Sequence, residues 1–500
     1  MSPRILLFLA AMLALSPPAR AQTPPADAPI SAADLRRHIG ILASDAFQGR
    51  KPATPGETLT TSYVTRELAA RGVEPAGVNG SWFQPVAVVE RGVGRHQAQW
   101  SANGRRIAVP NETLVLTGRD AQASIANAPV IFAGHGAVMP DRGIDQLAGA
   151  DFRGAVALVL YEGPGVDGFP SFQQRIETLA ERGALAVIGI TAPDLPWAQV
   201  QRAATRGSIA LDSGALPAAY GVISWEGAGA LLSGDGRSLE ALLNDQPGSS
   251  FRSVALPIRA TIDVATEVRR YRSNNVIGRI RGSASDGESV LLLGHWDHLG
   301  LCRPEGAPDR ICNGAVDNAS GIATLVEAAG RLASGTRPQR DILILATTAE
   351  EAGLLGAEQF ARTPVVPASS IVAAVNVDTA AIHPPGAPVA VIGGTSEMQA
   401  VLGRVAIGLG RRLDADREAD LLAERQDGWA LTRNGIPAMM AGGSFSDMRL
   451  LAAFLNGHYH GPDDEPSPGL ELGGAAEDAT LLVALARAFA DRTTYRAASR

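Results

Sequence analysis

The sequence lacks the features that mark several classes of protein. Only 19% of its 500 residues are charged, and Lys and Arg together (44) are fewer than Asp and Glu (51). The formal net charge is therefore −7. Because nucleic-acid-binding proteins usually carry a basic patch or stripe, we expect no nucleic-acid partner. No long low-complexity tract occurs, and a hydrophobic share of 46% is typical of a folded globular protein.

Long apolar runs are also missing, except near the N-terminus. There Arg4 precedes an apolar run from Ile5 to Leu15, which is followed by Ala19-Arg20-Ala21. A basic start, a short apolar core and an Ala-x-Ala end predict a secretory signal peptide over residues 1–21. No later segment has about 18 consecutive apolar residues. We therefore expect an exported protein, periplasmic or secreted, that has no membrane contact after signal cleavage.

Cysteine is scarce, since only Cys302 and Cys312 occur, ten positions apart. In an exported protein such a pair favours a disulfide that closes a local loop. The alternative is a pair of metal thiolates, although structural zinc sites typically space their paired cysteines more closely.

The length suggests two or three folded units, and the texture of the sequence changes along it. Residues 22–30 are rich in Pro and Ala and are expected to be a disordered lead-in. Amphipathic helical patterns follow within residues 31–124. Residues 125–262 read as short strands and helices, contain a single histidine and gather no cluster of ligands. We expect them to form a small inserted non-catalytic domain, which leaves residues 263–495 as the remaining unit.

In this last unit, near-continuous apolar runs alternate with helical patterns. The runs span residues 289–293, 341–346, 371–377 and 388–392. Such runs are expected of strands that are buried on both faces. The alternation predicts an α/β fold with a sheet that is parallel at least in its centre and covered by helices.

Polar residues of metal-binding type follow three of these strands. His295 and Asp297 follow the first strand, Glu350 and Glu351 the second, and Asp378 the third. In open α/β sheets, sites form in the crevice beyond the carboxyl ends of the strands. We therefore expect these side chains to lie at one edge of the sheet.

Each candidate residue has a simpler interpretation when it is taken alone. Asp317 lies directly before a predicted helix and could be its N-cap. The pair Glu350 and Glu351 could be a charged first helical turn, and His460 could belong to a polar loop. Together, however, these histidines and carboxylates form a nitrogen and oxygen donor set that is suited to zinc. A bridging Asp with two further ligands for each ion would make a paired site of the kind found in aminopeptidases, with ions about 3.5–4 Å apart.

Such a site has a defined chemistry. The metals lower the pKa of a water, polarise the scissile carbonyl and position the substrate. A free carboxylate then takes the proton of the water and passes it to the leaving amine.

Several segments of the chain resemble one family of metallopeptidases. In order they read LASDAFQGRKPATPGE, SNNVIGRIRG, LLLGHWDHLG, GAVDNASGIA, TTAEEAGLLGAEQF, NVDTAA and YHGPDDE. Their order and spacing are similar to those of metallopeptidase family twenty-eight, the co-catalytic zinc exopeptidases of the bacterial leucyl aminopeptidase and glutamate carboxypeptidase type. The resemblance covers nearly the whole mature chain. Within residues 125–262, DFRGAVALV and AERGALAVIGI resemble the protease-associated domain often inserted in this family.

The resemblance implies a fold and a role for each candidate residue. The fold is a mixed, centrally parallel sheet with helices on both faces, of the zinc-exopeptidase, phosphorylase/hydrolase-like type, interrupted by a smaller β-rich α/β domain. Residues 31–124 are then the N-terminal part of the peptidase domain, and residues 263–495 its catalytic part. The implied ligands of two Zn²⁺ ions are His295 and Asp378 on one, Glu351 and His460 on the other, and Asp317 between them.

The same resemblance assigns two helper carboxylates. It makes Glu350 the general base and acid, and Asp297 the residue that orients or tunes His295. It assigns no ligand position to His298, His383 or His458, which we interpret as neighbours or surface groups. Asp427 matches a family position, as either a support of the site or a surface charge.

The sequence therefore predicts a zinc-dependent aminopeptidase that removes N-terminal residues from peptides. A carboxypeptidase or a glutaminyl cyclase on the same scaffold remains an alternative, and a non-catalytic binding homologue is a more distant one. The sequence does not define the oligomeric state or the preferred substrate side chain.

Overall fold

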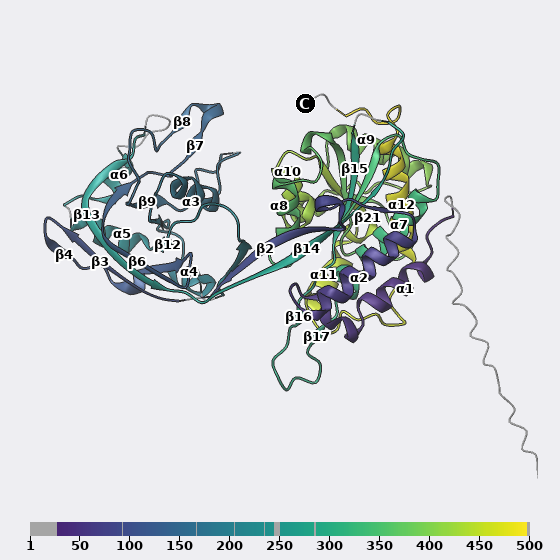
Figure 1. Cartoon of the computed structure of the whole chain (residues 1–500), viewed down its shortest axis with the longest axis horizontal. Coiled ribbons are helices and arrows are strands. Elements are labelled where there is room, and N and C mark those ends of the chain that lie inside the picture. The colour runs from purple at the N-terminus through teal and green to yellow at the C-terminus, as the bar shows by residue number, and fades with distance from the viewer. Residues whose placement is uncertain are drawn as a thin grey trace, which may run out of the picture.

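The computed structural model describes residues 28–92, 94–166, 168–204, 206–234, 236–244, 251–284 and 287–497. The predicted signal peptide and most of the predicted lead-in lie outside these residues. Figure 1 shows two units, which are joined by the long strands β2 (Phe83–Arg91) and β14 (Val268–Ile280). Within the described residues, no helix combines the length and the apolar character that crossing a membrane requires.

The larger unit is built on one mixed sheet. Its four central strands are parallel and are buried along most of their length, as the apolar runs predict. Antiparallel strands flank them on both sides, and β1 (Glu74–Pro75) pairs with β14. The strand order is β11 (Ser208–Leu211), β2, β14, β18 (Asp341–Thr347), β15 (Ser289–His295), β19 (Ile371–Asn376), β21 (Ala438–Gly442) and β20 (Ala390–Gly393).

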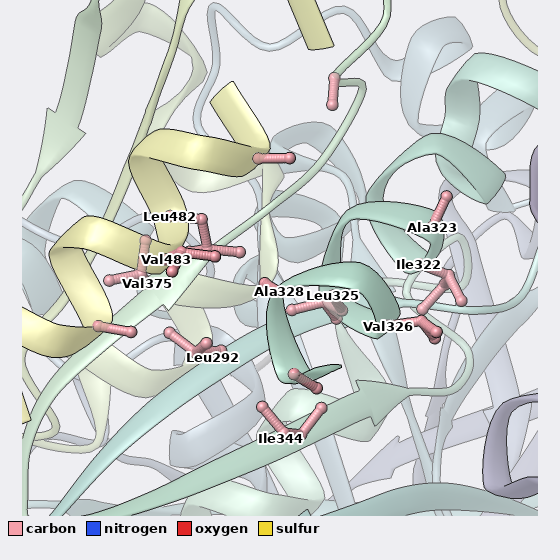
Figure 2. Close-up of a cluster of buried hydrophobic side chains, with 14 of the residues drawn as sticks. Leu292, Ile322, Ala323, Leu325, Val326, Ala328, Ile344, Val375, Leu482 and Val483 are labelled. Atoms are coloured by element: carbon pink, nitrogen blue, oxygen red, sulfur yellow. The ribbon is translucent and has the colours of Figure 1, made fainter. Parts of the chain in front are cut away.

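Helices cover both faces of this sheet. Successive residues of a strand point to opposite faces, and the central strands have apolar residues on both, so both faces need a cover. Leu292 packs on one face and its neighbour Leu293 on the other. Figure 2 shows Leu292, Ile344 and Val375 beneath side chains of two of the covering helices. The Leu292 face is covered by α1 (Ala32–Leu42), α2 (Pro55–Ala70), α7 (Ser320–Ala333), α9 (Ser396–Gly408) and α12 (Gly473–Ala490), and the Leu293 face by α8 (Leu355–Arg362) and α10 (Asp427–Arg433). The predicted mixed, centrally parallel sheet is confirmed.

The smaller unit contains a second mixed sheet. Its strands β6, β9, β10 and β12 are parallel to one another, and antiparallel strands flank them. The order is β4 (Arg105–Ile107), β3 (Arg95–Ala102), β13 (Val254–Ala265), β6 (Gln122–Phe132), β9 (Val156–Leu160), β10 (Ala186–Ile190), β12 (Ala219–Ile223) and β5 (Leu114–Gly118). Helices α3 (Phe172–Glu181), α4 (Trp197–Ala204), α5 (Trp225–Ser233) and α6 (Leu239–Asn244) and the short hairpin β7 (Val138–Met139) and β8 (Ile144–Asp145) complete this unit.

The pairing of the strands corrects the expected start of this unit at residue 125. β3, β4 and β5 all lie before residue 125, yet they pair in the second sheet. The chain enters the unit just after Gly92, whose N–H donates to the carbonyl of Glu267 at 2.8 Å, and leaves it after β13, although β11 within this span pairs with β2 in the larger sheet. The prediction was wrong because β2 and β3 are consecutive strands with the same two-residue hydrophobic period. The sequence pattern therefore does not change where the chain crosses from one sheet to the other.

The two cysteines lie beside a small hairpin of the larger unit. Strands β16 (Gly300–Leu301) and β17 (Ile311–Cys312) pair in antiparallel fashion, and Cys302 is joined to Cys312 by a disulfide. The predicted disulfide is therefore present. The Sγ atom of Cys312 lies 3.4 Å from the carbonyl oxygen of His460, which places the disulfide beside a predicted ligand.

Candidate metal centre

The ends of the central strands bring the predicted polar residues to one edge of the sheet. His295 is the last residue of β15 and is paired in register with Thr347, the last residue of β18. Glu350 and Glu351 follow β18, and Asp378 follows β19. Because the three strands are parallel neighbours, their carboxyl ends meet as the sequence predicts.

The first group of side chains surrounds the imidazole of His295. Its Nε2 atom lies 3.2 Å from Oδ1 of Asp317 and 3.4 Å from Oδ1 of Asp378. The Oε2 atom of Glu350 lies 3.9 Å from the same nitrogen. The ligand atoms of His295, Glu350 and Asp378 are close enough together to hold one metal ion.

The second group surrounds the other oxygen of Asp317. Nε2 of His460 lies 3.4 Å from Oδ2 of Asp317 and 2.7 Å from Oε2 of Glu351. Asp317 thus directs its two carboxylate oxygens toward different histidines, each of which has a second carboxylate beside it. A bridging ligand between two ions requires this arrangement.

The simpler interpretations of these residues do not hold. The N-cap of α7 is Ala319, and Asn318 rather than Asp317 accepts an N–H of its first turn, that of Gly321, so Asp317 is not a helix cap. Helix α8 begins at Leu355, so Glu350 and Glu351 do not form a first helical turn. Their carboxylates face the histidines of the cluster instead.

Backbone contacts fix the positions of Asp317 and His460. The carboxylate of Asp464 accepts the N–H of Val316 at 2.8 Å and that of Asp317 at 3.0 Å. His460 has a positive φ of 57°, and its ring stacks on Tyr459 with the centroids 3.7 Å apart. Both side chains are therefore oriented by neighbours in the YHGPDDE segment.

Asp297 acts differently from the expected partner of His295. Nδ1 of His295 lies 3.1 Å from the backbone carbonyl of Asp297 and 3.8 Å from its carboxylate. A hydrogen bond to that carbonyl fixes the tautomer, so that Nε2 is left to face the carboxylates. The carboxylate of Asp297 instead accepts the backbone N–H of Glu350 at 3.1 Å and so holds the segment that carries the predicted base.

Burial and mutual repulsion perturb the acids of this cluster. Burial is the main cause that raises the pKa of Asp297 to about 7. Burial, together with the charges of Asp378 and other acids, raises the pKa of Glu350 well above its ordinary value. Burial alone would lower the pKa of His295, but the charges of Glu350 and Asp378 raise it well above its ordinary value. Crowded carboxylates of this kind carry negative charge that bound dications neutralise.

The donor atoms of the cluster fit a metal. Within the described part of the chain, Nε2 of His295 and Nε2 of His460 are both buried without a hydrogen-bond partner, although carboxylate oxygens lie nearby. A buried polar atom without a partner costs about 1–3 kcal/mol, and coordination to a cation removes that cost. Imidazole nitrogen and carboxylate oxygen are both ordinary zinc ligands.

The sequence left the roles of several residues near the site open. Nδ1 of His298 lies 2.5 Å from Oε1 of Glu351 and 3.9 Å from Oδ2 of Asp317, close enough to these carboxylates to share a metal ion with them. Asp427 is buried and accepts a short hydrogen bond from Thr347, which favours support of the site over a surface charge. The segments HWDH and YHGPDDE contained the signal for His298 and Asp464, but proximity in sequence did not reveal their contacts.

The two remaining histidines lie apart from the cluster. His383 is buried, where its Nε2 lies 2.8 Å from the carboxylate of Asp478 on α12. It is therefore a core residue rather than a surface group. His458 is exposed, as expected for a surface group.

Comparison with known proteins shows what the region that carries this cluster is similar to. Residues 275–483 match the model of the family described as Peptidase family M28. This part of the chain is therefore similar to peptidase family M28. The matched range includes all five predicted ligands and both predicted helper carboxylates.

Curated relatives and solved structures that are similar to parts of this chain were also found. The Arabidopsis thaliana protein named "Probable glutamate carboxypeptidase AMP1" is 34% identical over 119 residues, which are 23% of this chain and 15% of that protein. The chain thus spans only a small part of that relative. An aminopeptidase from Aneurinibacillus sp. strain AM-1 is 19% identical, with a TM-score of 0.46 and coverage of 92% of this chain and 94% of its own. A zinc aminopeptidase from Bacillus subtilis is 17% identical, with a TM-score of 0.43 and coverage of 91% and 94%.

Proposed function

We propose that this protein is a zinc-dependent aminopeptidase that hydrolyses the N-terminal peptide bond of peptides. The observation that carries the proposal is the carboxylate of Asp317, whose two oxygens face two separate pairs of a histidine and a carboxylate. This arrangement lies at the strand-end edge of the region that is similar to peptidase family M28.

The cluster divides naturally into ligands for two zinc ions. His295 and Asp378 would hold one ion, Glu351 and His460 would hold the other, and Asp317 would contact both. When bound, zinc ions polarise the scissile carbonyl and lower the pKa of a nearby water.

Glu350 is the general base and acid of the proposed mechanism. Its carboxylate borders the cluster, 3.9 Å from Nε2 of His295, and its backbone is held by Asp297. A positioned carboxylate takes the proton of the attacking water and then donates it to the leaving amine. Because burial raises the pKa of Glu350, its side chain is also suited to keep that proton until the amine departs.

The charge of the site favours the amino end of a peptide. Acidic side chains are in excess around the cluster, where Asp464, Asp317, Asp297 and Glu351 favour the charged form of the Arg50 guanidinium. A substrate ammonium group is attracted by this excess, whereas a terminal carboxylate is repelled. The carboxyl-terminal specificity suggested by the name of the Arabidopsis relative is therefore the second candidate.

The cellular setting follows from the sequence. We propose that the protein is exported through the signal peptide over residues 1–21 and acts outside the cytoplasm. The smaller unit is built on a mixed sheet of its own, and we propose that it is the protease-associated domain that its sequence resembles. A disulfide in the larger unit agrees with an oxidising compartment.

The first test replaces the proposed base. Glu350→Gln should lower kcat about 10²–10⁴-fold, because a positioned acid or base typically contributes that much, while zinc content stays at two ions for each chain. The matched control is Glu162→Gln, a carboxylate that follows β9 of the other sheet and accepts the N–H of Ala192. Near-normal turnover by Glu350→Gln would exclude the mechanism.

A panel of peptides defines which end is cleaved. Zinc-loaded protein is assayed on one short peptide in four forms, with its amino end free or acetylated and its carboxyl end free or amidated. An aminopeptidase loses activity on acetylated peptides and keeps it on amidated ones. The opposite pattern would identify a carboxypeptidase, and cyclisation of an N-terminal glutamine without hydrolysis would identify a cyclase.

A further inference from the structure

Arg50 is a buried arginine that contacts carbonyl groups rather than a carboxylate. It ends the short helix η1 (Asp45–Arg50), and only 1% of its surface is exposed. Among the described residues, its guanidinium forms no ion pair and donates four hydrogen bonds to backbone carbonyls. These are Nε to Trp296 at 2.9 Å, Nη1 to Leu42 at 2.9 Å and to Asn313 at 2.6 Å, and Nη2 to Gly314 at 2.9 Å.

Three of these carbonyls belong to the two segments that carry the metal-centre residues. Trp296 lies between His295 and Asp297, and Asn313 and Gly314 directly precede the segment of Asp317. One planar guanidinium therefore fixes the distance between the His295 segment and the Asp317 segment. The carboxylate of Asp464 accepts two N–H groups of the Asp317 segment. The N–H groups of this segment are thus held by Asp464 and its carbonyls by Arg50.

A close backbone approach brings Arg50 to this position. Gly49 has a φ of +63°, and a Cβ atom on it would lie 2.3 Å from the carbonyl of Cys312 and 2.8 Å from Cα of Gly300. Only glycine fits there, so helix η1 can rest directly on the hairpin of β16 and β17. The sequence GR in the LASDAFQGR segment thus has a structural explanation.

The guanidinium also keeps its charge. Burial lowers the pKa of Arg50 to about 10, and the acids Asp464 and Asp317 oppose that effect. At neutral pH the side chain is therefore a fixed cation beside a cluster of carboxylates, and it reduces their repulsion before any metal binds.

We propose that Arg50 is a positioning residue of the metal centre, which holds the His295 and Asp317 segments at the separation that zinc binding requires. This inference rests on the proposed function, because it concerns the same cluster. It predicts that the protein binds zinc more weakly when Arg50 is replaced by a side chain that has the same charge but lacks the planar fork of donors.

The smaller unit offers a matched control for such a substitution. Arg175 on α3 is 2% exposed, and its guanidinium donates to the carbonyls of His135, Leu160 and Tyr161 at 2.5–2.8 Å. Burial lowers its pKa to about 10, as for Arg50. The two arginines therefore have the same local role, but only Arg50 borders the metal centre.

The test compares Arg50→Lys with Arg175→Lys in the full-length protein. Zinc affinity is measured by competition with a chromogenic zinc indicator, and the visible spectrum of the Co²⁺-loaded protein reports the ligand geometry. Arg50→Lys should weaken zinc binding and lower kcat at saturating zinc, each by about 10–100-fold, which is typical for groups that orient metal ligands. Its Co²⁺ spectrum should change while KM stays nearly constant, whereas Arg175→Lys should change none of these quantities.

Every outcome decides the inference. Arg50→Lys with normal zinc affinity and a normal Co²⁺ spectrum overturns it, even if the melting temperature falls as far as it does in Arg175→Lys. If Arg50→Lys does not fold, Arg50→Gln is measured instead, since it retains an N–H donor pair. Failure of both variants to fold in the presence of zinc also overturns it, because Arg50 would then be needed for folding. Failure of the wild-type protein to bind zinc instead contradicts the proposed function.

Discussion

The two units of this protein have the same kind of sheet but different chemistry at its edge. In each sheet, four parallel strands lie between antiparallel ones, which are β18, β15, β19 and β21 in the larger unit and β6, β9, β10 and β12 in the smaller one. Figure 1 shows the two sheets side by side, connected by β2 and β14. Parallel strands in both units therefore provide an edge at which side chains can converge.

What differs is how the polar groups at that edge are satisfied. After the strands of the smaller unit, Glu162 accepts the N–H of Ala192 at 3.0 Å, and Ser224 caps α5 by accepting the N–H of Gly227. These groups serve the fold. At the edge of the larger unit, Nε2 of His295 and Nε2 of His460 are buried without a hydrogen-bond partner among the residues that the structure describes. A shared architecture thus gives no function by itself, and the function lies in polar atoms that the fold leaves available for a ligand.

The largest expected effect is that of replacing Asp317, which lies between the two groups of metal-binding side chains. Asp317→Asn should lose both zinc ions and nearly all activity, because each oxygen of Asp317 faces a different histidine. An amide binds zinc far more weakly than a carboxylate and cannot bridge two ions with its NH₂ group. Zinc is counted by elemental analysis of the folded protein after gel filtration.

The control for this variant is a buried acid of the same unit outside the cluster. Asp478→Asn removes the negative charge that His383 and Arg411 contact and should reduce stability, yet the folded protein should keep two ions. If Asp317→Asn retains both ions, the division into two groups is wrong.

Much of this arrangement could be predicted from the sequence, because the signals were local. The apolar runs before His295 and Asp378 are long enough to define strands, and their polar ends follow directly. Parallel pairing then determines that these ends share one edge. The nearness of His295, Glu350 and Asp378 required no other information.

The remaining features depend on contacts between distant parts of the chain. Arg50 contacts carbonyls 246 to 264 residues away, and no hydrophobic period records such a hydrogen bond. The carboxylate of Asp297 turns toward the N–H of Glu350 instead of His295 because the loop after β18 passes beside it. The start of the smaller unit was misplaced for a related reason, since strand pairing and not strand formation determines which sheet a strand joins.

A smaller effect separates the cores of the two units. Leu292 and Leu158 are both fully buried central-strand residues, one in each unit, and Figure 2 shows Leu292 beneath the covering helices. Replacing either residue with Ala should cost about 2–5 kcal/mol of stability. Leu292→Ala should also weaken zinc binding, because β15 carries His295, whereas Leu158→Ala should leave zinc affinity unchanged.

Hydrogen exchange measured by mass spectrometry locates each effect. Leu292→Ala should speed exchange in peptides from β15, β18 and β19, and Leu158→Ala in peptides from β9, β10 and β12. Faster exchange across both units in either variant would show that the two cores unfold together and would remove the contrast between them.

The smallest effect concerns two acids whose pKa values are alike but whose surroundings are not. Glu327 on α7 is buried, which alone would raise its pKa, but the hydrogen bond with His38 and the charge of Arg71 lower it from 4.5 to about 2. In the smaller unit, contacts with Arg153 lower the pKa of Asp151 to about 2, yet both side chains are largely exposed. Solvent screens the exposed pair, so only Glu327 should contribute to stability.

A lowered folded-state pKa stabilises the protein above the unfolded pKa, and that contribution is lost as the pH falls through the folded value. Glu327→Gln should therefore cost roughly 3 kcal/mol at pH 7. Its difference from the wild type should shrink as the pH falls from 4.5 toward 2, as followed by urea unfolding at several pH values. Asp151→Asn should match the wild type throughout. A constant deficit of Glu327→Gln across this range would mean that packing of the side chain, and not its charge, stabilises the contacts of α1 and α2 with α7.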